Sequence, residues 1–182
     1  MSLLNNYDKI LYYIHNNPGS HFRKIKNGLG LSVGTIQYHL NKLEKDGKIL
    51  SIRNNFYKFY FPVGIFQEHE REILQVLNHT SLRKLLLFII EKKNPSKNEI
   101  ANYLNISYSS VNWHIEHLIA YKMIIDQKDG KSTRYSMNNK YDNIHKVIKL
   151  LQNHYRPIWD SWANRLAEMF ILLSDNDDDD GK

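Results

Sequence analysis

The stretch NPGSHFRKIKNGLGLSVGTIQYHLNKLEKDGKI, residues 17–49, decides the expected fold. A short helix ends in a tight turn at residues 28–31, where Gly30 is a residue type that tolerates the left-handed backbone of a helix end. Ser32 is placed to cap the next helix, because its hydroxyl can accept from a backbone N–H of the first turn. The apolar stripe of that helix consists of Ile36, Leu40 and Leu43. The pattern predicts two helices joined by a tight turn, with the polar face of the second helix uncovered.

The same pattern recurs 75 residues later in the chain. When residues 25–49 are laid over residues 100–124, seven pairs are identical: Ile25/Ile100, Asn27/Asn102, Leu29/Leu104, Ser32/Ser107, His39/His114, Leu43/Leu118 and Ile49/Ile124. Most of these residues are apolar or lie at the turn, and Asn105 takes the place of Gly30. Self-similarity of this kind indicates two copies of one structural unit.

Each copy has the same elements before the turn. A first amphipathic helix is expected from apolar residues at helical spacing: Tyr7, Ile10, Leu11 and Ile14 in one copy, and Leu82, Leu85, Leu86 and Ile89 in the other. Pro18 and Pro95 end these helices, because proline lacks the N–H that a helix interior needs. Ser20 and Ser96 are candidate caps of the next helix, and Ser96 with Glu99 has the spacing of a capping box.

A pair of β-rich runs follows the last helix of each copy. The first copy has residues 48–53 and 56–61, and the second has residues 124–128 and 132–137 around Asp129-Gly130, a dipeptide suited to a type I′ turn. Helix, helix, turn, helix and a two-stranded ribbon is the order of a winged helix-turn-helix domain. The expected fold class is therefore mainly α with small β-wings, as two tandem winged helix-turn-helix domains plus C-terminal helices.

The expected domain boundaries follow from these elements. The first winged domain covers residues 1–64, a linking helix covers 65–79, the second winged domain covers 80–140, C-terminal helices cover 141–174, and an acidic, disordered tail covers 175–182.

The charge points to a polyanionic partner. The chain has 25 Lys and Arg against 19 Asp and Glu, a formal charge of +6. Because the tail at residues 175–182 holds five of the acids and one lysine, residues 1–174 hold 24 basic against 14 acidic residues, a charge of +10. A surplus of this size favours nucleic acid as the partner over an acid-lined catalytic site.

Other classes of protein are disfavoured. The sequence contains no cysteine, which excludes disulfides, thiolate metal sites and a thiol nucleophile. No apolar run approaches the length that spans a bilayer, and the first residues lack the order of a signal peptide, so a soluble cytoplasmic protein is expected. No Ser-His-Asp set can be assembled from spacing, and Gly28-Leu29-Gly30 is better explained as a turn than as a phosphate-binding loop. We expect neither an enzyme nor a cofactor.

Residues 17–49 and residues 94–124, NPSKNEIANYLNISYSSVNWHIEHLIAYKMI, resemble the archaeal tandem winged helix-turn-helix transcriptional regulator family. The resemblance implies sequence-specific binding to double-stranded DNA, usually as a homodimer. The second copy departs from the family pattern, because Lys122 stands where the first copy has Gly47, and Glu116 lies on the exposed face of its third helix. The DNA reading that the resemblance implies therefore applies chiefly to the first copy.

The third helix of the first copy carries the expected base contacts. Gln37 and Asn41 are four residues apart and share one face, where their carboxamides can pair with adenine. Val33 and Thr35 are expected near a thymine methyl, and the nearby cations near phosphates. The full expected DNA-binding set is Arg23, Lys24, Ser32, Val33, Thr35, Gln37, Tyr38, Asn41, Lys42, Lys45, Arg53 and Lys58 in the first copy, and Ser109, Ser110, Asn112, Trp113, Lys131 and Arg134 in the second.

The histidines lead to other hypotheses. His39 and His114 occupy equivalent places and are expected to brace the wing. His114 and His117 have the helical spacing of two metal ligands, but no further ligand accompanies them, so no metal is expected. One alternative function is a ligand- or metal-responsive repressor. Another is a winged-helix protein-interaction module of the transcription machinery, in which both third helices face protein.

The C-terminal helices, broken or kinked at Pro157, carry an apolar stripe that predicts a homodimer. Its residues step alternately by three and four, which is the seam pattern of paired helices. The expected interface residues are Trp159, Trp162, Leu166, Met169, Phe170 and Leu173. In the alternative arrangement this helix packs on its own second domain, but a small winged domain would leave much of such a stripe exposed, which favours the dimer.

Overall fold

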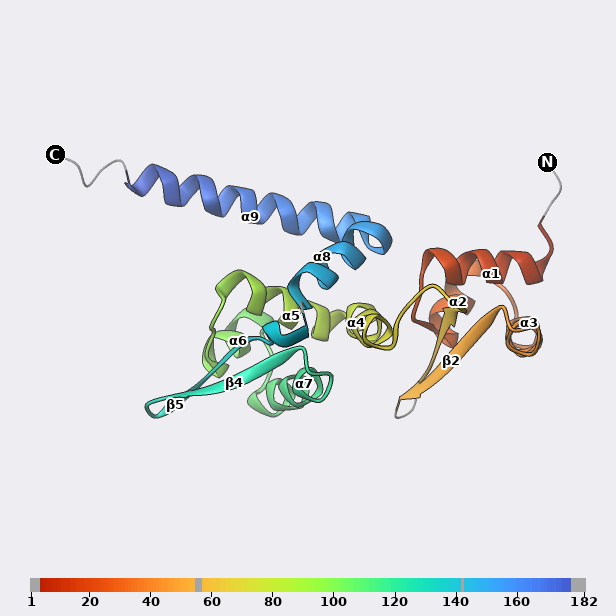
Figure 1. Ribbon diagram of the computed structural model, residues 1–182, viewed down its shortest axis with the longest axis horizontal. Coiled ribbons are helices and arrows are strands. Elements are labelled where there is room, and N and C mark those ends of the chain that lie inside the picture. The colour runs from red at the N-terminus through yellow and green to blue at the C-terminus, as the bar shows by residue number, and fades with distance from the viewer. Residues whose placement is uncertain (1–3, 55–56, 142, 178–182) are drawn as a thin grey trace. The chain divides into compact units, whose positions relative to one another are not determined.

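The computed structural model describes residues 4–54, 57–141 and 143–177, without the side chains of residue 141 and of residues 169–177. The chain divides into two compact units, Met1–Arg83 and Lys84–Lys182. Helices predominate in both units and the sheets are small and antiparallel, as the sequence predicts (Figure 1). The expected acidic tail is helical at residues 175–177, and its residues 178–182 lie outside the described part of the chain.

The first unit packs helices against a small sheet. The helices are α1 (Asn6–Asn16), α2 (Phe22–Leu29) and α3 (Val33–Lys45). The strands β1 (Ser20–His21), β2 (Ile49–Asn54) and β3 (Tyr57–Pro62) pair in the order β1-β3-β2. The buried core consists of Ile10, Ile14, Ile25, Ile36, Leu40, Leu43, Ile49 and Tyr60. Helix α4 (Glu68–Asn78) follows the sheet, and α5 (Thr80–Lys92) begins in this unit and continues into the second.

Strand β1 is an element that the sequence does not predict. Ser20 pairs with Tyr60, and the N–H of Gly19 donates to the Tyr60 carbonyl at 2.9 Å. Ser20 is therefore buried, and the prediction that it caps α2 is wrong. His21 is the cap, because its Nδ1 accepts from the Lys24 N–H at 3.3 Å. A strand of two residues is too short to show an alternating pattern.

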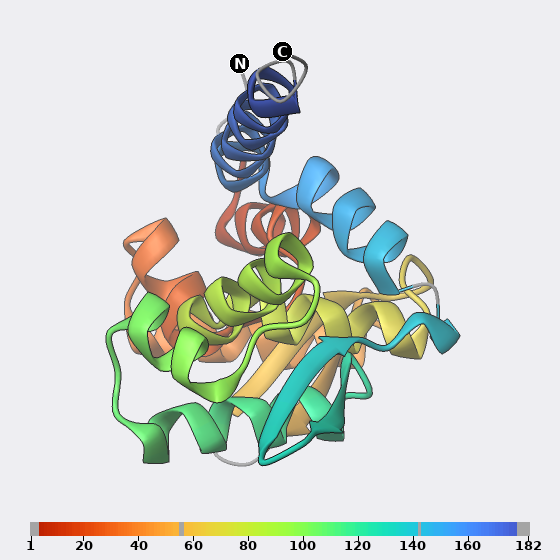
Figure 2. The ribbon, with the colours of Figure 1, turned by 90° about the vertical axis from the view of Figure 1, so that its left-hand side faces the viewer.

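The second unit continues α5 and repeats the order of the first. It contains α6 (Lys97–Leu104), α7 (Tyr108–Ala120), β4 (Ile124–Asp129) and β5 (Ser132–Met137), then the 3₁₀ helix η1 (Asn139–Tyr141), α8 (Asn143–His154) and α9 (Arg156–Asp177). Figure 2 shows the hairpin β4–β5 beside α7. The predicted capping box of Ser96 and Glu99 is confirmed.

The turn of this hairpin differs from the prediction. Asp129 pairs with Ser132, so the central residues are Gly130 and Lys131 and not Asp129 and Gly130. Gly130 has a φ of +59° and Lys131 has none in the positive range, which is the pattern of a II′ turn and not of a I′ turn.

The two units end their third helices with the same backbone hydrogen bonds. After α3, the N–H of Gly47 donates to the Glu44 carbonyl at 3.1 Å and that of Lys48 to the Leu43 carbonyl at 2.9 Å. After α7, the corresponding N–H groups of Lys122 and Met123 donate to Ile119 and Leu118 at 2.8 and 2.9 Å. Both pairs form the Schellman motif. Lys122 therefore keeps the left-handed backbone of the glycine that it replaces, with a φ of +56° against +66° at Gly47.

The break between α8 and α9 lies at Tyr155, two residues before the predicted breakpoint at Pro157. Pro157 is the second residue of α9, where a missing N–H costs no intrahelical hydrogen bond.

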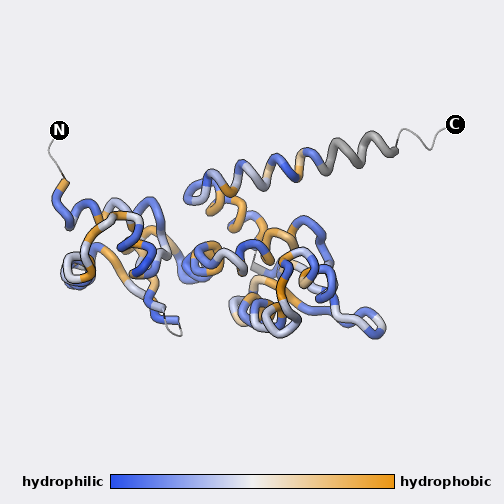
Figure 3. The backbone as a smooth tube through the Cα atoms, turned by 180° about the vertical axis from the view of Figure 1, so that it is seen from behind, coloured by the Kyte–Doolittle hydropathy of each residue, from blue (hydrophilic) through white to orange (hydrophobic). Residues whose placement is uncertain are grey.

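Hydropathy differs along the second unit, where α5 is largely apolar and the tip of the β4–β5 hairpin is hydrophilic (Figure 3). Across the described ranges, no single helix is long and apolar enough to cross a membrane, although the bent pair α4 and α5 together reaches that length and composition.

Exchanging glycine and lysine at the left-handed positions of the two Schellman motifs, Gly47 and Lys122, tests whether the two units share this helix end. Lys122→Gly is expected to raise the free energy of unfolding by about 0.5–1 kcal/mol, because a side chain is strained in the left-handed region. Gly47→Lys is expected to lower it by about 1–2 kcal/mol for the same reason. Urea denaturation followed by circular dichroism measures both changes, and effects of the same sign would contradict the shared motif.

Candidate nucleic-acid interface

Helix α3 presents an open polar face because its apolar face is buried. Ile36, Leu40 and Leu43 are fully buried in the core. On the other side, Val33 is 56% exposed and Tyr38 is 64% exposed. The remaining exposed members of the predicted set on this helix and its cap are Ser32, Gln37, Asn41, Lys42 and Lys45, and Thr35 is half-buried.

The two predicted base-reading residues bind each other. The Gln37 carboxamide nitrogen donates to Asn41 Oδ1 at 3.0 Å. This bond holds the two side chains together on the solvent side of α3. The bond leaves Gln37 Oε1 as an acceptor and the Asn41 amide N–H groups as donors for other partners. Adenine recognition in the major groove needs an acceptor and a donor of this kind.

The start of the reading helix is organised by side-chain oxygens. The Ser32 hydroxyl accepts from the Thr35 N–H at 3.2 Å, and the two hydroxyl oxygens lie 2.8 Å apart. Ser32 is therefore the N-cap that the sequence predicts. A capped helix start directs N–H groups and a partial positive charge outward, which favours a phosphate nearby.

A hollow of about 610 Å³ lies beside Lys42, lined by Asn5, Asn6, Tyr7, His39, Lys42 and Asp46. The Lys42 ammonium lies over the Tyr7 ring at 5.4 Å, and the Tyr7 hydroxyl donates to Asp46 Oδ2 at 2.8 Å. The hydrogen bond to Asp46 is the main reason that the pKa of Tyr7 is raised. His39 meets the rings of Tyr7 and Tyr38 edge-on, so these ring contacts are with α1 and with α3 itself, and its expected role in bracing the wing stays a prediction.

Two of the predicted phosphate-binding lysines have partners within the chain. The Lys24 ammonium donates to Asn78 Oδ1 at 2.6 Å, and its burial lowers its pKa, with a further contribution from the Arg83 charge. Lys58 forms an ion pair with Glu44 at 2.8 Å. Both lysines serve the packing of the first unit, and neither presents a free cation for DNA. Arg23 and Arg53 are exposed, as are Lys42 and Lys45.

Asn78 explains why Lys24 points inward. Its amide nitrogen donates to the carbonyls of Pro18 and Leu74, both at 2.9 Å, while its oxygen accepts from Lys24. The end of α4 is thereby fastened to the loop before β1 and to α2. The sequence gives no sign of this link, because Lys24 and Asn78 lie 54 residues apart.

Helix α7 is the counterpart of α3 in the second unit, but its exposed side chains differ from those of α3. Ser109 and Asn112 are exposed, Ser110 is half-buried and Trp113 is 44% exposed. The Trp113 ring lies 3.9 Å from the His117 ring, and the His117 Nδ1–H donates to the Trp113 carbonyl at 3.0 Å. No Lys or Arg occurs in Tyr108–Ala120, so this face lacks the cations that phosphates require.

The predicted wing cations of the second unit differ from each other. Arg134 Nε donates to Asp129 Oδ2 at 2.8 Å, and its Nη1 donates to the Asn94 carbonyl and to Glu99. Its guanidinium is therefore neutralised by acidic neighbours, which also raise its pKa. Lys131, at the turn, is exposed.

The histidines of α7 do not come together with other metal ligands. His114 is buried with its ring 4.9 Å from that of Trp113, and His117 is half-buried with its ring 3.9 Å from that of Trp113. Within the part of the chain that the structure describes, no group of three or more His, Cys, Asp or Glu side chains is arranged to hold a metal ion.

The predicted dimer residues fall into three groups. Trp162 is only 2% exposed, so it is covered within a single chain. Trp159 and Leu166 are half-buried, and the rings of Trp159 and Trp162 meet edge-on at 5.8 Å. Arg165 forms an ion pair with Glu91 of α5 at 2.7 Å, which fastens α9 to its own unit. The side chains of Met169, Phe170 and Leu173 lie outside the described residues.

Comparison with known proteins places the first unit among helix-turn-helix domains. Residues 5–74 match the family model HTH_HVO_0163_N, described as an N-terminal HTH domain. An uncharacterized HTH-type transcriptional regulator of Methanocaldococcus jannaschii is 27% identical over 145 residues. These residues are 79% of this chain but only 36% of that relative.

Comparison with solved structures gives matches that cover about half of the chain. Reduced HlyU from Vibrio cholerae is 14% identical, with a TM-score of 0.40 over 46% of this chain and 86% of that one. NolR from Sinorhizobium fredii is 20% identical, with a TM-score of 0.39 over 47% and 83%. An ArsR-like transcriptional regulator from Rhodococcus sp. RHA1 is 19% identical, with a TM-score of 0.38 over 57% and 92%.

The role of Asn78 can be tested by truncation. Asn78→Ala removes the acceptor of Lys24 and the donor to Pro18 and Leu74, so we expect the free energy of unfolding to fall by about 1–3 kcal/mol. Asn16→Ala is the matched control, since Asn16 is exposed and its amide nitrogen donates to the Tyr12 carbonyl one turn before it. Chemical denaturation of both variants measures the difference. Equal effects would show that the Asn78 link does not stabilise the first unit.

Proposed function

We propose that the chain is a sequence-specific DNA-binding transcriptional regulator whose α3 reads the major groove. The match of residues 5–74 to an N-terminal HTH domain and the similarity to an archaeal HTH-type regulator support the proposal. The observation that carries the proposal is the open face of α3, where Gln37 and Asn41 form a hydrogen-bonded pair beside two exposed lysines. A helix of this kind fits the major groove and contacts base edges from its N-terminal half. The proposed role is regulatory and not catalytic. A protein with this role would act on the chromosome, in the cytoplasm.

The phosphate contacts of this proposal come from both sides of α3. Lys42 and Lys45 are exposed toward its C-terminal end, Arg23 is exposed on α2, and Arg53 is exposed near the tip of the wing. Such cations neutralise phosphates and position the helix without reading sequence.

We propose that the regulator is a homodimer through α9. Leu166 is partly exposed, and the apolar residues Met169, Phe170 and Leu173 continue the same sequence stripe beyond it. Two reading helices related by a two-fold axis would occupy half-sites about 34 Å apart, or a multiple of that distance.

For the second unit, the surface of α7 favours contact with protein over contact with DNA. An exposed tryptophan on a face without Lys or Arg is typical of an interface between proteins. This supports a role of the second unit in docking to the transcription machinery, while the first unit reads DNA.

Substitutions on α3 test the reading face. Gln37→Ala with Asn41→Ala is expected to weaken binding by about 1–3 kcal/mol for each base that these side chains read, and to relax the base preference at those positions. Lys42→Ala is the matched control, which should weaken all sequences alike and reduce the salt slope by about one. Fluorescence anisotropy over a range of salt, on a site selected from genomic fragments by gel shift, measures both effects.

Two results would overturn the proposal. Unchanged affinity and base preference in the double variant would exclude this reading face. Sequence-independent binding by the native chain, together with capture of a polymerase component, would favour the protein-interaction module for both units.

A charged residue on α9 tests the dimer. Leu166→Asp is expected to raise the dimer dissociation constant at least about tenfold, because an unpaired carboxylate would be buried at the interface. Sedimentation velocity over a range of concentrations measures it, with Glu168→Gln, an exposed position nearby, as the control. A native chain that sediments as a monomer at every concentration would contradict the dimer.

A further inference from the structure

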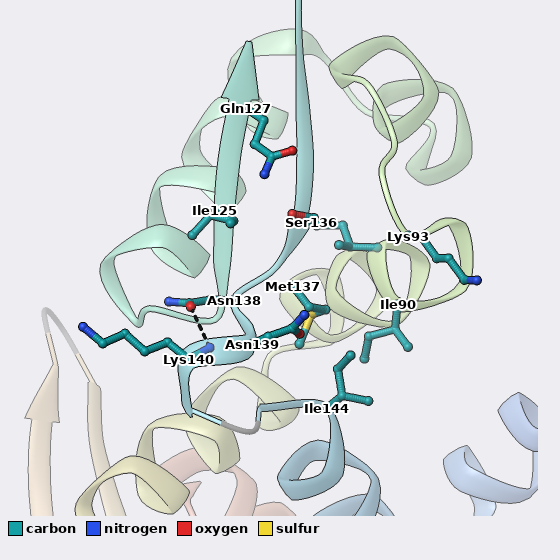
Figure 4. Close-up of a pocket in the computed structure, with 11 residues that line it drawn as sticks. Ile90, Lys93, Ile125, Gln127, Ser136, Met137, Asn138, Asn139, Lys140 and Ile144 are labelled. Atoms are coloured by element: carbon teal, nitrogen blue, oxygen red, sulfur yellow. Dashed lines mark hydrogen bonds between the residues drawn. The ribbon is translucent and has the colours of Figure 1, made fainter. Parts of the chain in front are cut away.

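A pocket of about 580 Å³ lies in the second unit, apart from the reading face of α3. Its walls come from the end of α5, the hairpin β4–β5, η1 and the start of α8, all within Lys84–Lys182 (Figure 4). The volume falls in the range of sites that hold small molecules.

The inner wall of the pocket is aliphatic. Ile90 of α5, Met137 of β5 and Ile144 of α8 converge on the hollow from different elements (Figure 4). None of the described residues that line the pocket is aromatic, so this wall fits a hydrocarbon body better than a flat ring that would need a stacking partner. The amides of Asn138 and Asn139 lie at one side, and Asn138 Oδ1 accepts from the Lys140 N–H at 3.2 Å.

The charged side chains among the described lining residues are all basic. They are Lys93 and Lys140, and no Asp or Glu occurs in this described part of the lining. Both ammonium groups point away from the hollow, so the cations lie at its rim and the apolar side chains lie inside (Figure 4). Lys93 directly follows α5 and has a left-handed backbone with a φ of +65°, and its N–H donates to the Ile89 carbonyl at 2.9 Å.

From this arrangement we infer that the pocket binds an amphipathic organic anion, with its aliphatic chain inside and its carboxylate at the rim beside Lys93. A medium-chain carboxylate has this division of charge. The charged head stays hydrated at the mouth, which avoids the cost of burying an ion, while the chain is removed from water. The inference rests on the pocket alone and is independent of the proposed DNA binding.

The test is calorimetric titration of the full chain with decanoate, kept below its micelle concentration, and with decanol as the neutral match. The native chain is expected to bind decanoate saturably at one site and decanol more weakly. Ile144→Trp is expected to abolish binding by filling the hollow. Lys93→Gln is expected to weaken decanoate binding about two- to fivefold, as for an exposed ion pair, and to leave decanol unaffected.

Controls separate the pocket from general attraction to a basic protein. Lys128→Gln removes an exposed cation of β4 that does not line the pocket, and it should leave binding unchanged. Circular dichroism checks that Ile144→Trp folds. If it does not fold, Ile125→Trp is used in its place, because Ile125 lies on the pocket wall and is 39% exposed. Absence of saturable binding, or unchanged binding in a folded tryptophan variant, would overturn the site. Equal binding of decanol and decanoate would overturn the assignment to an anion.

Discussion

The burial of one stripe of α3 is the constraint on which the rest of the first unit depends. Ile36, Leu40 and Leu43 are fully buried, and fully burying a side chain of this kind contributes about 1.5–3 kcal/mol. Rotating the helix would expose them, so the core holds its orientation. The residues on the other side, Gln37 and Asn41 among them, are then directed to solvent by the geometry of the helix.

The second unit shows how far this constraint reaches. Its third helix keeps the buried stripe, the serine cap and the Schellman motif, even though a lysine occupies the left-handed position. The exposed face is under no such requirement, and in α7 it carries Trp113 and His117 in place of an amide pair and cations. Repetition of the fold therefore does not repeat the surface, and function has to be argued separately for each unit.

Net charge overstates the number of cations available to DNA. Lys24, Lys58 and Arg134 belong to the predicted binding set, yet each is paired within its own unit. Of the exposed cations of the set in the first unit, two lie on α3 itself, one on α2 and one on β2: Lys42, Lys45, Arg23 and Arg53. The surplus of positive charge favours a polyanionic partner, while the pairing of cations within each unit decides which of them are available to it.

What the sequence by itself determined is local: the helix positions, the serine caps at Ser32 and Ser107, the left-handed ends at Gly30 and Asn105, and the repeat. Each depends on periodicity or on a cap a few residues away, so the pattern is present in the linear chain. Tertiary structure alone decided strand β1, the inward turn of Lys24, the cover over Trp162 and the pocket beside Lys93. These features arise from residues that are distant in the chain and meet only after the core has formed, and no local spacing records which distant groups will become neighbours.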